Sequence, residues 1–230
     1  MELLVFGHAG QRVLVFPTRE GRFYDYENWH QVEAVGDFIE AGTIQLFCPD
    51  SIDSESLYCW QRSPRERIIK HGQYEAYILE EVMAFTTSKN RTAEVVAHGC
   101  SIGAYHAVNI VLRHPSVFSK VVAFSGRYDL TRPSGIFPDL FSGYYDQDIY
   151  FHTPNHFLPG LNDDSILAQL RRLAITITVG EQDPFRQSNC ELSHALAQKG
   201  ISHQFVIWDG EAHRARCWRQ MARLYLGNGH

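Results

Sequence analysis

The sequence predicts an α/β fold in which helices cover both faces of a mostly parallel central sheet. Strand-like and helical patterns alternate along the 230 residues, without repeats or low-complexity linkers. A Gly-x-Ser-x-Gly motif stands where one strand-like run passes into a helical run. Two later strand-like runs each end in a turn that carries a polar side chain, Asp183 or His213. We expect a single domain over residues 1–230.

The first half of the chain is expected to contain a hairpin, two helices and a strand. Residues 3–6 and 12–16 flank Gly7-His8-Ala9-Gly10, which predicts two paired strands. A helix around residues 27–39 should lead to a strand at 43–48. Ser63-Pro64-Arg65-Glu66 combines an N-cap serine, a proline at the first helical position and a capping-box glutamate, so a helix should run to about residue 85.

The second half continues the alternation. We expect strands at residues 94–98, 120–124, 173–179 and 203–208, and helices at about 101–113, 164–173, 186–199 and 218–226. Residues 126–160 lack clear periodicity and are expected to form a lid-like insertion.

The motif Gly99-Cys100-Ser101-Ile102-Gly103 is the strongest chemical signal. A serine at its centre must lie on a strained turn, and the two glycines remove side chains that would collide there. The turn would present the Ser101 hydroxyl as a nucleophile. It would also aim the backbone N–H of Ile102 at the negative charge that develops on an attacked carbonyl. Cys100 is an alternative nucleophile, which we interpret instead as a small buried packing residue.

Asp183 and His213 are the candidate acid and base. Asp183 lies in the turn Gly180-Glu181-Gln182-Asp183-Pro184, and His213 ends the loop that begins at Asp209. The chain order is therefore Ser, Asp, His, which is one of the known orders of a catalytic triad. Glu181 and Asp209 could compete for the acid role, but we interpret both as turn formers.

The motifs together resemble the α/β-hydrolase-fold esterases, and most closely the group that contains enterochelin-esterase-like and esterase-D-like serine esterases. The resemblance spans nearly the whole chain and is carried by residues 99–107, 124–130, 180–184 and 213–221. It implies an α/β-hydrolase fold and a serine carboxylesterase with an acyl-enzyme intermediate and no cofactor. Arg214-Ala215-Arg216-Cys217 departs from the family's usual residues after the histidine, so the substrate is not carried over.

Two other functions remain open on the sequence. An acyltransferase or a thioesterase could use the same triad, because nothing in the residues says whether water accepts the acyl group. A non-catalytic binding protein on a hydrolase fold is disfavoured, because it has no physical need for Ser101, Asp183 and His213 in order.

A second oxyanion donor is expected in the loop after the strand that ends at Phe16. Pro17 has no N–H, so the donor should be Thr18 or Arg19. The alternative is a plain surface turn with solvated charges.

The insertion is rich in aromatic side chains, with seven between Phe137 and Phe157. So many rings must cover the core, a partner or a ligand. We expect Phe141, Tyr145 and Phe151 to line the substrate site, because the insertion follows a strand that ends at the same sheet edge as Ser101. Packing on the core or on a second subunit is the alternative.

The composition and charge of the chain indicate which classes of partner to expect. The chain has 21 basic and 26 acidic residues, a net charge of −5 and no long basic stripe, so we expect no nucleic acid. No apolar stretch approaches the roughly 20 residues that span a bilayer, and the start lacks a signal-peptide pattern. We therefore expect a cytoplasmic protein without membrane contact, whose partner is a small-molecule ester. The sequence leaves room for a homodimer.

Neither a disulfide framework nor a metal site is expected. The five cysteines are an odd number without a C-x-x-C pair. Among twelve histidines, His152 and His156 have helical spacing, but Pro154 lies between them and opposes a helix that would align them.

Overall fold

A seven-stranded sheet organises the computed structural model, which describes residues 1–227. The strand order is β1-β3-β2-β4-β5-β6-β7, and every neighbouring pair is parallel except β1 with β3. The prediction of a mostly parallel sheet is therefore confirmed. The strands are β1 (Leu3–Phe6), β2 (Gln11–Phe16), β3 (Ile44–Pro49), β4 (Val95–Cys100), β5 (Lys120–Phe124), β6 (Ala174–Gly180) and β7 (Gln204–Trp208).

The expected hairpin between residues 3–6 and 12–16 is wrong. Both segments are strands, but β1 pairs antiparallel with β3, and β3 lies between β1 and β2. Strand β2 is buried on both faces, so it takes a central position with parallel neighbours on each side. The half-buried β1 is left at the edge of the sheet.

Outside the insertion 126–160, the helices match the predicted segments with two main differences. The helix expected at 27–39 is divided into three short ones, because His30 adopts a left-handed backbone (φ 55°) between the first and the second. The helix that starts at the Ser63–Glu66 capping box runs on through a π-helical turn, Ile78–Val82, to Lys89. The helices are α1 (Asp25–Asn28), α2 (Gln31–Ala34), α3 (Gly36–Glu40), α4 (Pro64–Tyr77), α5 (Met83–Lys89), α6 (Ile102–Arg113), α7 (Gln147–Phe151), α8 (Pro154–Gly160), α9 (Asp164–Leu170), α10 (Arg186–Gln198) and α11 (Ala215–Tyr225).

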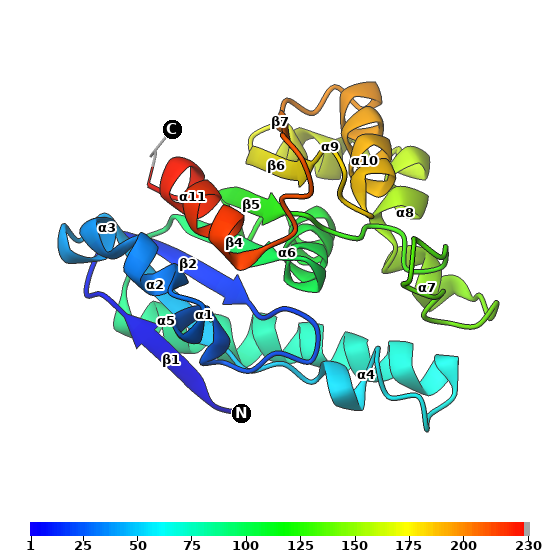
Figure 1. Ribbon diagram of the computed structural model, residues 1–230, viewed down its shortest axis with the longest axis horizontal. Coiled ribbons are helices and arrows are strands. Elements are labelled where there is room, and N and C mark those ends of the chain that lie inside the picture. The colour runs from blue at the N-terminus through cyan, green and yellow to red at the C-terminus, as the bar shows by residue number, and fades with distance from the viewer. Residues whose placement is uncertain (228–230) are drawn as a thin grey trace.

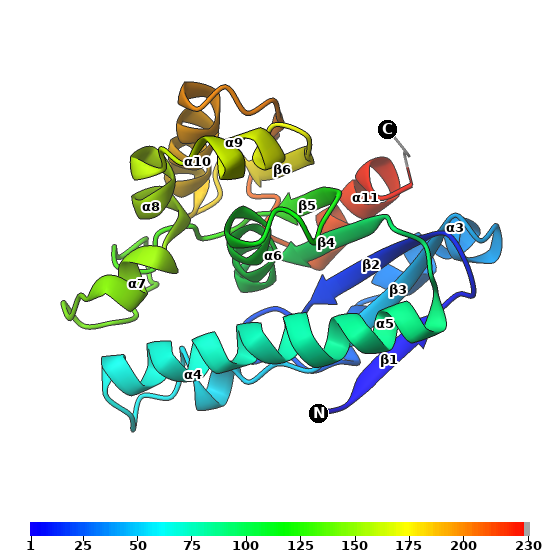
Figure 2. The same ribbon diagram turned by 180° about the vertical axis from the view of Figure 1, so that it is seen from behind.

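Two apolar cores form on the two faces of the sheet. Val13 and Val15 of β2 point to the face covered by α11 and by α1–α3, which lie in front of the sheet in Figure 1. Leu14 and Phe16 point to the opposite face, covered by α4–α6 and α8–α10; α4–α6 lie in front of the sheet in Figure 2. This period of two follows from the strand backbone.

The insertion 126–160 is partly helical and packs largely on the protein itself. Asp146 caps α7 through the N–H of Ile149, and Pro154 opens α8, so both short helices begin with ordinary start signals. Phe141 and Ile149 are buried in a third apolar cluster with residues of α4 and α6. The segment therefore extends the core beyond the end of the sheet.

In the part of the chain that the structure describes, no helix is both long and apolar enough to cross a membrane. All five cysteines are free thiols, and Cys48 and Cys100 are buried.

A buried carboxylate joins α4 to α6. Glu75 Oε1 accepts hydrogen bonds from Arg113 Nε and His114 Nε2, both at 2.9 Å, and Oε2 accepts one from Asn109 Nδ2 at 3.0 Å. Burial alone would raise the pKa of Glu75, but the hydrogen bond from His114 and the charge of Arg113 hold that pKa below its ordinary value. The ionised carboxylate therefore stabilises the fold.

We expect Glu75→Gln to lower the free energy of unfolding at pH 7 by about 3 kcal/mol, because Arg113 then lacks its counter-charge in a partly buried site. The matched control is Asp37→Asn, which breaks the exposed pair with Arg223 and should cost under about 1 kcal/mol. Urea denaturation measures both. The folded-state pKa of Glu75 is depressed, so its contribution is full above the unfolded value of about 4.3 and disappears as the pH falls through the folded value. A difference between wild type and Glu75→Gln that grows on acidification would contradict this account.

Candidate active site

Ser101 lies in the sharp turn between β4 and α6. Its backbone is left-handed in φ (57°) with ψ at −122°, a strained conformation for a residue with a side chain. The Ser101 N–H donates to the carbonyl of Phe124 at the end of β5, at 2.8 Å. The N–H groups of Ile102 and Gly103 open the helix and have no carbonyl partner within it.

The two glycines of the motif are required by close backbone contacts. A Cβ on Gly99 would lie 2.3 Å from the carbonyl group of Gly103. A Cβ on Gly103 would lie 2.3 Å from the carbonyl oxygen of Phe16 and 2.6 Å from that of Pro17. The first turn of α6 therefore packs directly on the end of β2. This contact brings the loop with Thr18 and Arg19 beside the serine turn.

The structure brings the candidate acid and base together. His213 Nδ1 and Asp183 Oδ2 are 3.0 Å apart, and the other oxygen of Asp183 accepts the backbone N–H of Phe185 at 2.9 Å. The Asp183 side chain is fully buried, whereas the imidazole is 18% exposed. A carboxylate held in this way fixes the orientation of the imidazole. Glu181 and Asp209, the competing acids, are both exposed, and no described contact joins either to His213.

Two aromatic rings hold the imidazole from its sides. The ring centroids of Trp218 and Phe185 lie 5.1 and 5.5 Å from that of His213, both in edge-on geometry. Trp218 is in the first turns of α11 and is itself tied to Ser125 by a hydrogen bond from Nε1 to Oγ at 3.4 Å. The rings leave His213 little freedom to turn away from Asp183.

A cleft of about 310 Å³ lies over the serine turn. Its lining includes five residues that the sequence singled out: Ser101, Ile102, Thr18, Arg19 and His213. Sequence reasoning placed Phe137 only within the aromatic insertion and missed the other wall residues, because they come from separate loops and helices without a shared motif. The rest of the wall consists of Trp29, Tyr58, Arg127, Phe137, Phe185 and Trp218.

The three predicted substrate residues do not line this cleft. Phe141 is 1% exposed and packs in the third apolar cluster. The Tyr145 hydroxyl lies 2.8 Å from His156 Nδ1, and Phe151 packs edge-on against Tyr150. The insertion contributes Phe137 to the cleft instead, because the chain passes the cleft before it turns into the buried segment around Phe141.

Cys100 is buried next to the serine and packs in the core on the α11 face. Burial raises the pKa of its thiol well above the ordinary value. The thiol is therefore protonated at neutral pH, which makes it a poor nucleophile.

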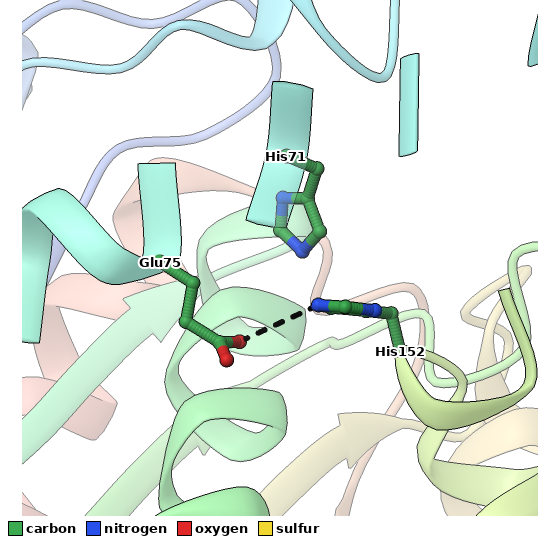
Figure 3. A group of neighbouring side chains, drawn as sticks. All are labelled: His71, Glu75 and His152. Atoms are coloured by element: carbon green, nitrogen blue, oxygen red, sulfur yellow. Dashed lines mark ion pairs between the residues drawn. The ribbon is translucent and has the colours of Figure 1, made fainter. Parts of the chain in front are cut away.

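One group among the described residues has metal-ligand spacing. His71, Glu75 and His152 offer ligand atoms within 4.8 Å of one another, and Figure 3 shows the three side chains pointing toward one another. His152 Nε2 and Glu75 Oε2 are 3.9 Å apart. However, Glu75 already accepts three hydrogen bonds, and the adjacent Arg113 guanidinium opposes a second cation. We interpret the group as a buried polar network between α4, α6 and α7. His156, the other histidine with helical spacing to His152, contacts Tyr145 and Asp129.

Residues 25–221 match a family model described as "Putative esterase". No curated protein matches the chain.

Several solved structures share the fold. A ferulic acid esterase is 16% identical, with a TM-score of 0.77, and the match covers 98% of this chain and 90% of that one. An S-formylglutathione hydrolase from Staphylococcus aureus is 17% identical at a TM-score of 0.69, covering 97% and 83%. A fluorophosphonate-binding serine hydrolase of the same organism is 16% identical at 0.65, covering 96% and 85%. At these identities the likeness establishes the α/β-hydrolase fold alone.

We expect Gly103→Ala to lower the free energy of unfolding by about 3 kcal/mol, because the added Cβ meets two backbone carbonyls that cannot move independently of β2. Gly36→Ala is the control, since nothing lies within 4 Å of a Cβ there, and its stability should be unchanged or slightly higher. Thermal and urea unfolding measure both. Equal effects of the two substitutions would contradict the close contact.

Proposed function

The chain belongs to the esterase family, and on that premise we propose that it cleaves carboxylic esters with a Ser101-His213-Asp183 triad through an acyl-enzyme intermediate. The observation that carries the proposal is the hydrogen bond between His213 Nδ1 and Asp183 Oδ2, at one side of a cleft that Ser101 also lines. With Nδ1 bonded to the carboxylate, Nε2 is the ring nitrogen free to take a proton.

In the first half of the reaction, His213 Nε2 accepts the proton of the Ser101 hydroxyl as its oxygen attacks the ester carbonyl. Asp183 stabilises the imidazolium that forms. The tetrahedral intermediate collapses when His213 returns the proton to the leaving alkoxide, and the alcohol departs. Water then attacks the acyl-enzyme as His213 Nε2 takes its proton. His213 returns that proton to the Ser101 oxygen when the carboxylic acid is released.

The oxyanion needs backbone donors placed before the reaction starts. We assign one to the N–H of Ile102, at the first position of α6 and therefore without a helical partner. We assign the other to Thr18 or Arg19, whose loop borders the same cleft. The contact of Gly103 with Phe16 and Pro17 supports this pairing, because it fixes the distance between the two loops.

The size of the cleft supports a small or medium-sized ester. A volume of about 310 Å³ is at the lower end of the range for ligand pockets. Five aromatic rings form much of its wall, from Trp29, Tyr58, Phe137, Phe185 and Trp218. We further propose that residues 1–230 act as one domain, in which the insertion 126–160 supplies part of this wall.

Ser101→Ala should abolish turnover of 4-nitrophenyl acetate and labelling by a fluorophosphonate, because the proposal assigns the attack on the carbonyl to the Ser101 hydroxyl. Its circular dichroism and melting temperature should stay near those of the wild type. Cys100→Ala should retain the label, since the thiol is buried and protonated. Labelling that survives in Ser101→Ala but is lost in Cys100→Ala would move the nucleophile to Cys100.

Asp183→Asn should lower kcat by about four orders of magnitude, because an amide at this position favours the wrong tautomer of His213. Glu181→Gln, in the same turn but exposed, should change kcat less than about threefold. Steady-state kinetics on 4-nitrophenyl acetate measure both. If Glu181→Gln were the more damaging substitution, the acid would have to be reassigned.

A further inference from the structure

We propose that the cleft binds esters that carry a carboxylate, and that the anion is held by Arg127 and Arg19 beside the Tyr58 hydroxyl. This inference rests on the proposed esterase function and names a substrate class for the same site. It follows from the charges that border the cleft and from the partners that each of them has.

Arg127 is a buried cation without a carboxylate partner. The residue is 3% exposed. Its Nε donates to the carbonyl of Asp129, and one terminal nitrogen donates to the carbonyls of Arg132 and Pro138 at 2.8 and 2.7 Å. These bonds hold the guanidinium in place, and none of them comes from a carboxylate; Asp129 and Asp139 favour its charged form only through space. Among the described residues, no Asp or Glu lies within ion-pair distance of it, and its second terminal nitrogen makes no hydrogen bond.

The guanidinium lies on the side of the cleft. Its central carbon is 5.9 Å from the ring centroid of Phe185, which also borders the cleft and packs against His213. Its charge acts on Tyr58, another wall residue: burial and Asp53 raise the pKa of Tyr58, while Arg127 and Arg19 oppose that rise. The raised pKa keeps the hydroxyl protonated and able to donate to an anion. No described contact gives that hydroxyl a partner.

Arg19 adds a second cation at the opening. It is exposed, its guanidinium carbon lies 5.9 Å from the Tyr58 ring, and it forms no ion pair among the described residues. Glu20 follows it in the chain and is also exposed, but it does not border the cleft. The cleft wall thus holds two arginines and no acidic residue, in a chain whose net charge is −5.

The acidic groups nearest to this wall have other partners. Asp129 pairs with Arg132 and His156. The two oxygens of Asp139 accept the N–H groups of Phe141 and Gly143. Asp53 is bonded to His106. Asp129 and Asp139 favour the charged form of Arg127 through space, but none of the three forms an ion pair with it, so a carboxylate on the substrate would be its first direct counter-charge. Bonds from a guanidinium to a carboxylate are among the strongest hydrogen bonds in proteins.

The test uses two matched pairs of esters, because the carboxylate could be on the acyl or on the alcohol side. The acyl pair is mono-4-nitrophenyl adipate and its methyl ester. The alcohol pair is 4-acetoxybenzoate and its methyl ester. For each pair, the ratio of kcat/KM for the charged to the neutral ester is compared between the wild type and each variant, so that intrinsic reactivity cancels.

We expect Arg127→Gln to lower this ratio by about 10- to 100-fold in at least one pair, as for the loss of a charged hydrogen bond. Arg19→Gln should lower it by about 3- to 10-fold, because Arg19 is exposed. Arg127→Lys keeps the positive charge, so its ratio should lie between those of the wild type and Arg127→Gln. In the wild type, raising KCl from 0.02 to 0.5 M should slow the charged ester more than the neutral one.

Arg91→Gln is the matched control. This arginine is exposed, forms no ion pair among the described residues and does not border the cleft, so both the ratio and the basal activity should stay unchanged. If Arg127→Gln does not fold, Arg19→Gln and the salt dependence still decide. Equal losses on charged and neutral esters, or unchanged ratios in both pairs, would overturn the inference while leaving the esterase proposal standing. Failure to cleave any ester, together with no labelling of Ser101, would instead refute the esterase proposal itself.

Discussion

The contact between the first turn of α6 and the end of β2 is the constraint on which the rest of the site depends. It exists because Gly103 has no side chain and the Phe16 carbonyl can approach it. A larger residue would push helix and strand apart, and the loop of Thr18 and Arg19 would move away from Ile102. The strained backbone of Ser101 is held by the same contact and by the bond to Phe124. Strain of this kind persists only where neighbouring structure over-determines it.

The parallel pairing of the strands brings the other site residues to one edge of the sheet. The carboxyl ends of β4, β5, β6 and β7 are in register, with Cys100 opposite Phe124 and Gly180 opposite Trp208. Each following loop therefore starts at the same edge of the sheet. Ser101 and His213 border one cleft there, and His213 is bonded to Asp183, although Ser101 and His213 are 112 positions apart in the sequence. The same geometry places Arg127, three residues after β5, at that edge.

Much of this could be predicted from sequence because the signals are local. The central strands are apolar runs buried on both faces, and the serine turn carries its steric requirement in two glycines. The pairing of β1 could not be predicted, since β3, which takes the place beside β2, lies nearly thirty residues further along the chain. The burial of Phe141 could not be predicted either, because it depends on how α4 and α6 pack around this ring. Both errors concern contacts between distant segments.

The two arginines of the cleft are a further feature that the sequence alone could not predict. In the sequence, Arg127 stands in an ordinary polar stretch and Arg19 next to an acidic neighbour, so neither differs from a solvated surface residue. Folding removes Arg127 from water and satisfies three of its bonds with carbonyls, which carry no charge. It also directs the nearby acids to other partners. A cation in such a place strengthens any interaction with an anion, because little water remains to screen it. The charge of the proposed substrate can therefore be inferred only from the structure, once the partners of each buried charged group are known.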